Sequence, residues 1–141
     1  MKIYRRIVVT LFSAIFILGG IAHFVLGRTN PEGYSVFADT ALIPALADLW
    51  RNFAMPNISW LTIVLGCYEF AAGVGLILPR TRRFAAIAML LFLVFITVVG
   101  YGFPTTTILD DILKNRLFTT VMAVLILPLL YGKKHDRTRH V

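Results

Sequence analysis

The chain has few of the residues on which most enzyme mechanisms depend. It has a single cysteine, Cys67, which excludes an intramolecular dithiol and disulfide couple as a redox centre. It has three histidines, of which His135 and His140 lie in a polar tail, so haem held by two membrane histidines of one chain is also excluded. Neither a glycine-rich phosphate loop nor a serine nucleophile motif occurs. The sequence therefore identifies no catalytic residue, and it leaves open whether the protein is an enzyme.

Charged residues are also scarce. They make up 15% of the chain, against about 25% in soluble domains, while 58% of the residues are hydrophobic and the mean hydropathy is +0.80. This composition is typical of an integral membrane protein, whose solvent is the lipid bilayer. The 141 residues are enough for one domain, and apolar runs occupy most of them. We therefore predict a single membrane domain over residues 1–141.

Three apolar runs, at residues 7–26, 58–78 and 84–103, are each about 20 residues long, which is the length that crosses the hydrocarbon core of a bilayer. A fourth run, at residues 117–131, has only 15 residues, but Ile112 and Leu113 extend it upstream, so we place the fourth span at residues 112–131. We therefore predict an all-α integral membrane four-helix bundle. The first run also resembles the core of a signal peptide, with small residues at positions 20–22. We disfavour that interpretation because the apolar residues continue to Leu26, and because cleavage would leave three spans whose basic loops could not all lie inside.

The basic residues lie mostly at one end of the predicted bundle. Ten of them precede the first span, fill the turn between spans two and three, or form the tail: Lys2, Arg5, Arg6, Arg80, Arg82, Arg83, Lys133, Lys134, Arg137 and Arg139. The other end has four, which five acidic residues outnumber. Since basic loops stay in the cytoplasm, we predict a multi-pass protein of the cytoplasmic (inner) membrane with both termini in the cytoplasm. This rule and anionic lipid head groups explain the net charge of +7, so we predict no nucleic-acid partner.

The connection between the first two spans contains an amphipathic segment at residues 44–53. Asp48, Arg51 and Asn52 lie on one helical face of it. The opposite, apolar face consists of Leu46, Leu49, Trp50 and Phe53. This pattern predicts an extracytoplasmic helix in the membrane interface, which either covers the bundle or only shields the span ends. Trp60 and Tyr101 are expected in the aromatic belt on the same side.

Glu69 lies near the middle of the second run and is the strongest functional candidate in the sequence. A charged side chain at this depth costs about 2.5–3.5 kcal/mol on insertion scales, so such residues normally face protein and mark a function. Gly66 and Gly73 share its helical face, which predicts the close approach of another helix. A second row of small residues predicts that this span packs on two sides, and it would also allow a homo-oligomer. The row is Cys67, Ala71 and Gly75.

His23 is the second candidate, because the sequence around it repeats the pattern around Glu69. The stretch Gly20-Ile-Ala-His-Phe-Val-Leu-Gly27 matches Gly66-Cys-Tyr-Glu-Phe-Ala-Ala-Gly73 at both glycines, the polar position and the phenylalanine. At 1.5 Å per residue, His23 lies about 10 Å above the middle of the membrane, so contact with Glu69 needs long reach or a water. The two are candidates for proton handling or ligand binding, with local hydrogen bonding between helices as the alternative. Two ligands are too few for a catalytic zinc, and we predict no metal site.

Three stretches of the chain together resemble one family, the DoxX-like membrane proteins. The main match is a G-x-x-E helix, Gly66-x-x-Glu69-x-x-x-Gly73-x-Gly75-Leu76, followed by the turn Pro79-x-Thr81-Arg82-x-x-Ala85-Ala86. The end of the first span, Gly20-x-x-His23-Phe24, is similar to that of the family. Gly102-Phe103-Pro104 is a weaker match to a related subgroup. The motifs carry over Gly66, Glu69, Gly73, Pro79 and Arg82 as family-pattern residues.

The resemblance implies a four-helix bundle, in agreement with the count of apolar runs, and a link to redox chemistry. The family includes subunits of thiosulfate:quinone oxidoreductase and components of membrane complexes involved in oxidative-stress defence. The implied function is an accessory or anchoring subunit of a membrane-associated redox complex with a redox partner protein, and the resemblance alone implies a quinone as cofactor. Two other functions stay open: a small transporter or ligand-binding protein that uses Glu69 and His23, and a quinone-linked oxidoreductase.

Overall fold

The computed structural model describes residues 2–131, and the predicted basic tail lies outside the described residues. All regular elements of this part of the chain are helical, and four helical segments are long and apolar enough to cross a membrane. These segments are Ile3–Thr29, Pro44–Ile77, Arg82–Val99 and Ile108–Leu129. The prediction of an all-α membrane bundle is therefore confirmed.

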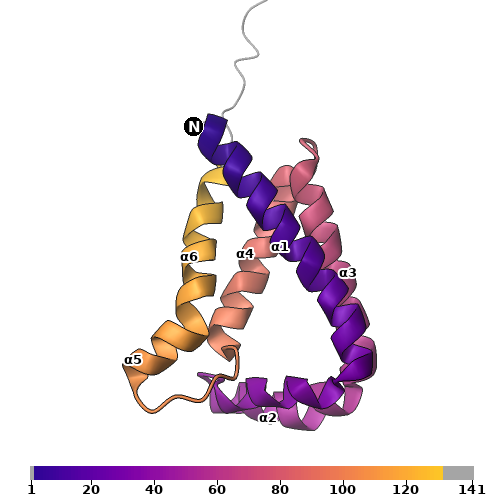
Figure 1. The fold of residues 1–141 in the computed structure, drawn as a ribbon, viewed down its shortest axis with the longest axis vertical. Coiled ribbons are helices and arrows are strands. Elements are labelled where there is room, and N and C mark those ends of the chain that lie inside the picture. The colour runs from indigo at the N-terminus through magenta and orange to yellow at the C-terminus, as the bar shows by residue number, and fades with distance from the viewer. Residues whose placement is uncertain (1, 132–141) are drawn as a thin grey trace, which may run out of the picture.

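The α-helices are arranged as two pairs with a crosspiece (Figure 1). They are α1 (Lys2–Thr29), α2 (Pro44–Leu49), α3 (Ile58–Ile77), α4 (Arg82–Val99), α5 (Ile108–Asp111) and α6 (Leu117–Ile126). Helices α1 and α3 run side by side in opposite directions, α4 and α6 form the other side of the bundle, and α2 crosses the base. Short 3-10 or π-helical turns complete the chain: η1 (Pro31–Asp39), η2 (Trp50–Ala54), η3 (Met55–Asn57), η4 (Ile112–Arg116) and η5 (Leu127–Leu129).

Two span ends differ from the sequence prediction for local backbone reasons. Helix α4 ends at Val99 and not at residue 103, because Gly100 and Gly102 adopt φ values of 84° and 77°. Residues other than glycine are strained at such positive φ values, because their Cβ atom clashes with the backbone. The fourth segment begins at Ile108 and not at residue 112, since the Thr107 hydroxyl accepts a hydrogen bond from the Asp110 amide at 3.1 Å and caps the helix start.

The hydrophobic core joins α1, α3, α4 and α6 in the half of the bundle away from α2. Phe12, Leu76, Met89 and Ile126 contribute one fully buried side chain from each of these helices. Large apolar side chains on the outer faces are exposed, for example Phe84 at 74%. An apolar core inside an apolar surface is the pattern expected of a bundle that is solvated by lipid.

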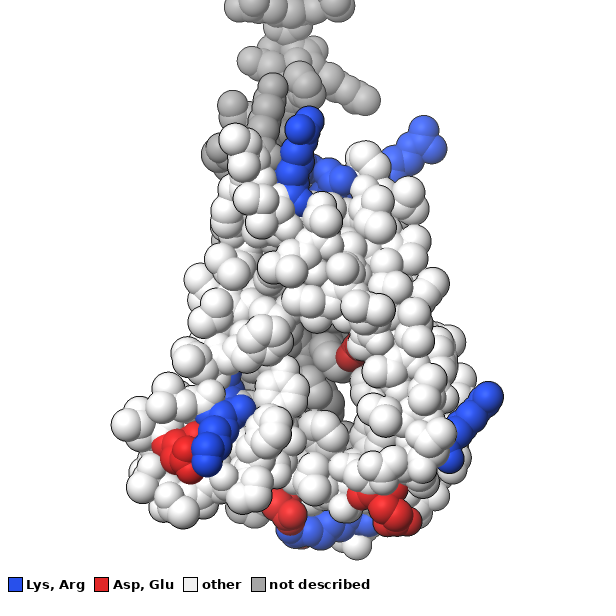
Figure 2. Space-filling model, in the orientation of Figure 1, with Lys and Arg blue, Asp and Glu red and all other residues white. Residues whose placement is uncertain are grey.

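On the face drawn in Figure 2, charged side chains gather at the two ends, and the band between them shows only one acidic side chain, inside a hollow. The end at the start of α1 and the α3–α4 turn carries Arg side chains. The α2 end carries both signs, including the ion pairs Arg51–Asp39 and Lys114–Asp110 at 3.1 and 2.9 Å. The uncharged band has the composition of a surface in contact with hydrocarbon.

The segment at residues 44–53 crosses the base of the bundle (Figure 1), and only part of its apolar face is buried. Trp50 is buried, whereas Leu49 and Phe53 are 55% and 49% exposed. The buried positions are instead Ala47, Trp50 and Ala54, because two small residues beside the indole let it pack closely against η1. Of the apolar face identified in the sequence, Trp50 therefore packs on the bundle, while Leu49 and Phe53 stay exposed.

The prediction that Cys67, Ala71 and Gly75 form the second packed face of α3 is wrong in part. Cys67 and Ala71 are exposed, so they do not form a packed ridge within the chain. The second packed face of α3 is instead formed by the buried residues Ala72 and Leu76, each one position after a residue of the predicted row. Gly75 also approaches Ala85 of α4.

Candidate functional site

The site is built on a seam of glycines where α1 crosses α3. A Cβ atom at Gly20 would lie 2.6 Å from the Gly66 carbonyl oxygen, and one at Gly66 would lie 2.8 Å from the Gly20 carbonyl oxygen. The two backbones are therefore in contact, and only glycine fits at either position. The repeated sequence pattern thus corresponds to two antiparallel helices that meet at the first glycine of each repeat.

His23 and Glu69 come together across this seam, with His23 Nε2 at 3.4 Å from Glu69 Oε1. Each residue lies one turn beyond its crossing glycine, in opposite directions along the pair. Helical side chains lean towards the N-terminus of their own helix, so in an antiparallel pair these two lean towards the crossing point and meet. The sequence-based separation of about 10 Å between His23 and the middle of the membrane was calculated from the helical rise alone and did not include this tilt of the side chains. The prediction that the two residues form a pair is supported by direct side-chain contact.

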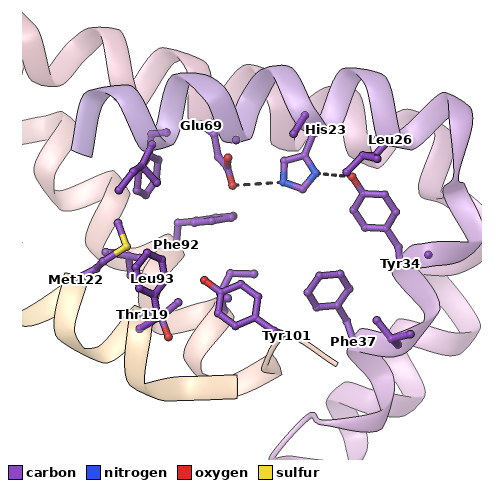
Figure 3. Close-up of a pocket in the computed structure, with 18 of the residues that line it drawn as sticks. His23, Leu26, Tyr34, Phe37, Glu69, Phe92, Leu93, Tyr101, Thr119 and Met122 are labelled. Carbon is purple, nitrogen blue, oxygen red and sulfur yellow. Dashed lines mark hydrogen bonds and ion pairs between the residues drawn. The ribbon is translucent and has the colours of Figure 1, made fainter. Parts of the chain in front are cut away.

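Tyr34 extends the pair to a chain of three residues, and the sequence analysis missed it. Its hydroxyl lies 2.7 Å from His23 Nδ1, and the two rings stack with centroids 5.7 Å apart (Figure 3). Burial raises the pKa of the Tyr34 hydroxyl, and the negative charge of Glu69 raises it further. When Nδ1 accepts from the Tyr34 hydroxyl, a neutral imidazole carries its proton on Nε2, the nitrogen that faces the Glu69 carboxyl group.

The three residues line a cavity of about 430 Å³. Helices α1, α3, α4 and α6, together with η1, contribute to its wall, and most of the lining side chains are apolar. Glu69 is the acidic residue of this lining, and it is itself only 6% exposed. A cavity of this size with a few convergent polar groups is what small-molecule sites have in common.

Tyr101 was expected in an interfacial aromatic belt, but its ring points into the cavity (Figure 3). Helix α4 ends at Val99, so Tyr101 lies in the irregular segment after it, where its amide donates to Asn115 Oδ1 at 3.2 Å. Burial raises the pKa of the Tyr101 hydroxyl, with a smaller contribution from the charge of Glu69. Trp60 matches the belt prediction better, since it is 48% exposed.

The α2 end of the cavity is closed by a row of aromatic side chains. Tyr34 stacks on Phe37, Phe37 packs against Trp50, and Trp50 packs against Phe95, with centroid distances of 6.0, 5.5 and 6.5 Å. The Trp50 indole also donates to the Tyr34 carbonyl oxygen at 2.8 Å. The sequence left open whether this segment covers the bundle or only shields the span ends, and the aromatic row joins it to the residues that line the cavity. The opening is instead in the side wall, where Figure 2 shows a hollow within the uncharged band.

A buried polar cluster centred on Arg116 fixes the same end of the bundle. Its guanidinium donates to Asp111 Oδ2 at 2.7 Å, to the Thr97 carbonyl at 2.6 Å and to the Thr40 carbonyl at 2.6 Å. Asn115 accepts hydrogen bonds from the Tyr101 and Phe103 amides at 3.2 and 2.9 Å. The sequence analysis counted Arg116 only as a loop charge. The cluster holds Tyr101 and the η1–α2 connection around the cavity.

The remaining family-pattern residues have structural positions away from the cavity. Gly66 and Gly73 form the α1–α3 seam, where a Cβ at Gly73 would lie 3.0 Å from the Ser13 carbonyl oxygen. Pro79 and Arg82 lie at the α3–α4 turn, and Arg82 donates to the Leu76 and Ile77 carbonyls at 2.9 and 2.8 Å. Arg82 thus satisfies carbonyl groups that the end of α3 leaves without helical partners.

Within residues 2–131, no group of three or more His, Cys, Asp or Glu side chains is placed to hold a metal ion. No family model matches the chain, and neither a curated protein nor a solved structure matches it.

Proposed function

We propose that this protein binds a small lipophilic molecule inside the membrane, and that the molecule enters through the side wall of the bundle. The observation that carries this proposal is the Tyr34–His23–Glu69 chain in the wall of an otherwise apolar cavity of about 430 Å³. This is the ligand-binding or small-transporter function among those that the sequence left open. Glu69, His23 and Tyr34 supply the polar anchor, and the surrounding apolar side chains supply the contact area.

Two further observations support entry from lipid. At the α2 end, the aromatic row and the Arg116 cluster pack side by side with the cavity residues Tyr34, Phe37 and Tyr101. The hollow lies between the two charged ends of the molecule, and the surface around it in Figure 2 consists mostly of uncharged residues. A molecule already dissolved in the bilayer can reach such an opening without crossing a charged surface.

Filling the cavity is expected to remove the bound molecule. Ala22 lines the cavity, and Ala22→Trp places an indole in the space. We expect binding to weaken at least ~10-fold, equal to about 1.4 kcal/mol, while the fold is retained. Native mass spectrometry of protein extracted from its own membrane in lipid nanodiscs measures the occupancy. Ala71→Trp is the matched control, because Ala71 is exposed on α3 and does not line this cavity. Wild-type protein that emerges without any bound small molecule would contradict the proposal.

The anchoring function implied by the DoxX-like resemblance, with its redox partner and quinone, stays a prediction. So do the quinone-linked oxidoreductase and the homo-oligomer. The same mass spectra distinguish them, because a redox enzyme in fixed ratio with this chain supports the anchoring function. A second copy of the chain instead supports oligomerisation through the exposed Cys67 and Ala71 row.

We also propose that both termini lie in the cytoplasm and that α2 lies outside it, in a cytoplasmic membrane. The basic end of the bundle and the mixed charge of the α2 end support this orientation. In a Cys67→Ser background, Ser35→Cys at the α2 end is expected to react with a membrane-impermeant maleimide on intact cells. Arg80→Cys, in the α3–α4 turn, is expected to react only after permeabilisation. The reverse pattern would contradict the orientation.

A further inference from the structure

The polar side chains that line the cavity indicate which class of small molecule it binds. The polar side chains of the lining are His23, Asn30, Tyr34, Glu69, Tyr101 and Thr119. When Nδ1 accepts the hydrogen bond of the Tyr34 hydroxyl, a neutral imidazole presents its Nε2 proton to the Glu69 carboxyl group. Among residues 2–131, His23 is the basic side chain that lies within ion-pair distance of Glu69. The lining has one carboxyl group and neither lysine nor arginine, so an ionised Glu69 has no permanently charged cation beside it.

An uncompensated carboxylate in an apolar site is costly, and a ligand of positive charge offsets that cost. The same charge excludes anionic ligands by repulsion. A hard divalent cation would need several oxygen ligands in addition, which this lining does not bring together. A monovalent organic cation needs only one carboxylate and a hydrophobic enclosure.

The aromatic content of the wall favours the same class of ligand. Six of the 19 lining residues are Phe or Tyr: Phe16, Tyr34, Phe37, Phe92, Tyr101 and Phe118. The faces of aromatic rings attract cations, most strongly when the cation is shielded from water. Quaternary and tertiary ammonium groups are bound in this way because they are too weakly hydrated to prefer bulk water. The side opening into lipid admits such a cation when it also carries apolar groups.

We propose that the cavity binds a lipophilic organic monocation, with Glu69 as its counter-charge and the aromatic wall around its ammonium group. This inference rests on the proposed binding function and adds the charge of the ligand. Glu69 contacts the ligand directly, whereas His23 and Tyr34 act as positioning residues that hold the carboxylate from one side. The free Glu69 Oε2 lies against Gly19, where a Cβ would collide with it. Gly19 thus provides the space in which that carboxylate oxygen sits.

Two isosteric probes test the charge preference. Phenyltrimethylammonium and tert-butylbenzene have nearly the same shape, but only the first carries a positive charge. Equilibrium binding of each to wild-type protein in nanodiscs is measured, with the signal of empty nanodiscs subtracted. We expect the cation to bind roughly 10-fold tighter or more. Glu69→Gln should remove this preference, and Glu69→Asp, which keeps the charge, should retain much of it.

Glu32→Gln is the matched control, because Glu32 is an exposed carboxylate of η1 outside the cavity lining. It should leave the preference unchanged. If both probes bind equally, and Ala22→Trp displaces both, the cation inference is overturned and the binding function stands. If neither probe binds, the cation inference is overturned, and the occupancy found by native mass spectrometry separately decides the binding function. If Glu69→Gln does not fold, loss of the preference in Gly19→Ala, which displaces the carboxylate, tests the same contact.

Discussion

Arg116→Leu is expected to destabilise the protein by about 3–5 kcal/mol, because it breaks a buried ion pair and leaves its partner without a counter-charge. Arg116 is 8% exposed, and its guanidinium binds the Asp111 carboxylate through both Nε and Nη2, at 2.7 and 3.3 Å. Loss of the arginine also leaves the carbonyl groups of Thr97 and Thr40 without this donor. Reversible unfolding by SDS in mixed micelles measures the change in the free energy of unfolding.

Lys114→Met provides the matched control for Arg116→Leu. Lys114 pairs with Asp110 at 2.9 Å one turn along the same helical segment, but the lysine side chain is 49% exposed. Such exposed pairs contribute only about 0.3–0.5 kcal/mol, so this variant should unfold almost as wild type does. Combining Arg116→Leu with Asp111→Leu should recover part of the lost stability, since the unpaired carboxylate is removed as well. Equal effects of Arg116→Leu and Lys114→Met would contradict the assigned role of the cluster.

The fold was largely predictable because membrane spans leave a strong local signal. Each span needs about 20 apolar residues, and this requirement depends on length and composition alone. The ends of the spans were less predictable. Val99 ends α4 because Gly100 and Gly102 turn the chain, and a hydropathy pattern carries no information on backbone angles.

The site was predictable in part. Glu69 and His23 could be identified because polar residues are rare inside spans, and the glycines beside them indicated close packing. Tyr34 and Tyr101 could not, because they lie outside the spans and reach the cavity only through the path of the connecting segments. Arg116 was hidden for a similar reason: its partner Thr40 is 76 residues away in sequence. A charged residue at the end of a span is normally interpreted as lying in the membrane interface. The sequence therefore contains no sign that Arg116 is buried.

Gly66→Ala is expected to separate α1 from α3 and to remove ligand binding at the same time. A Cβ at Gly66 would lie 2.6 Å from Phe24 Cε1 and 2.8 Å from the Gly20 carbonyl oxygen. The Phe24 ring can rotate away, but the carbonyl belongs to the backbone of α1, so the helices have to move apart. Overpacking of this kind costs about 1–3 kcal/mol. Because His23 and Glu69 meet across the same seam, the movement also breaks their contact.

Gly75→Ala distinguishes this steric effect from the general effect of replacing a glycine in a helix. Alanine is the better helix former by about 1 kcal/mol, which favours both variants equally. At Gly75 the nearest atom is the Cβ of Ala85 at 3.2 Å, and no backbone atom of α4 is among the close neighbours. We therefore expect Gly75→Ala to leave the stability in SDS and the binding of phenyltrimethylammonium close to wild type. Gly66→Ala should lower both, and unchanged binding in that variant would show that the cavity does not depend on the seam.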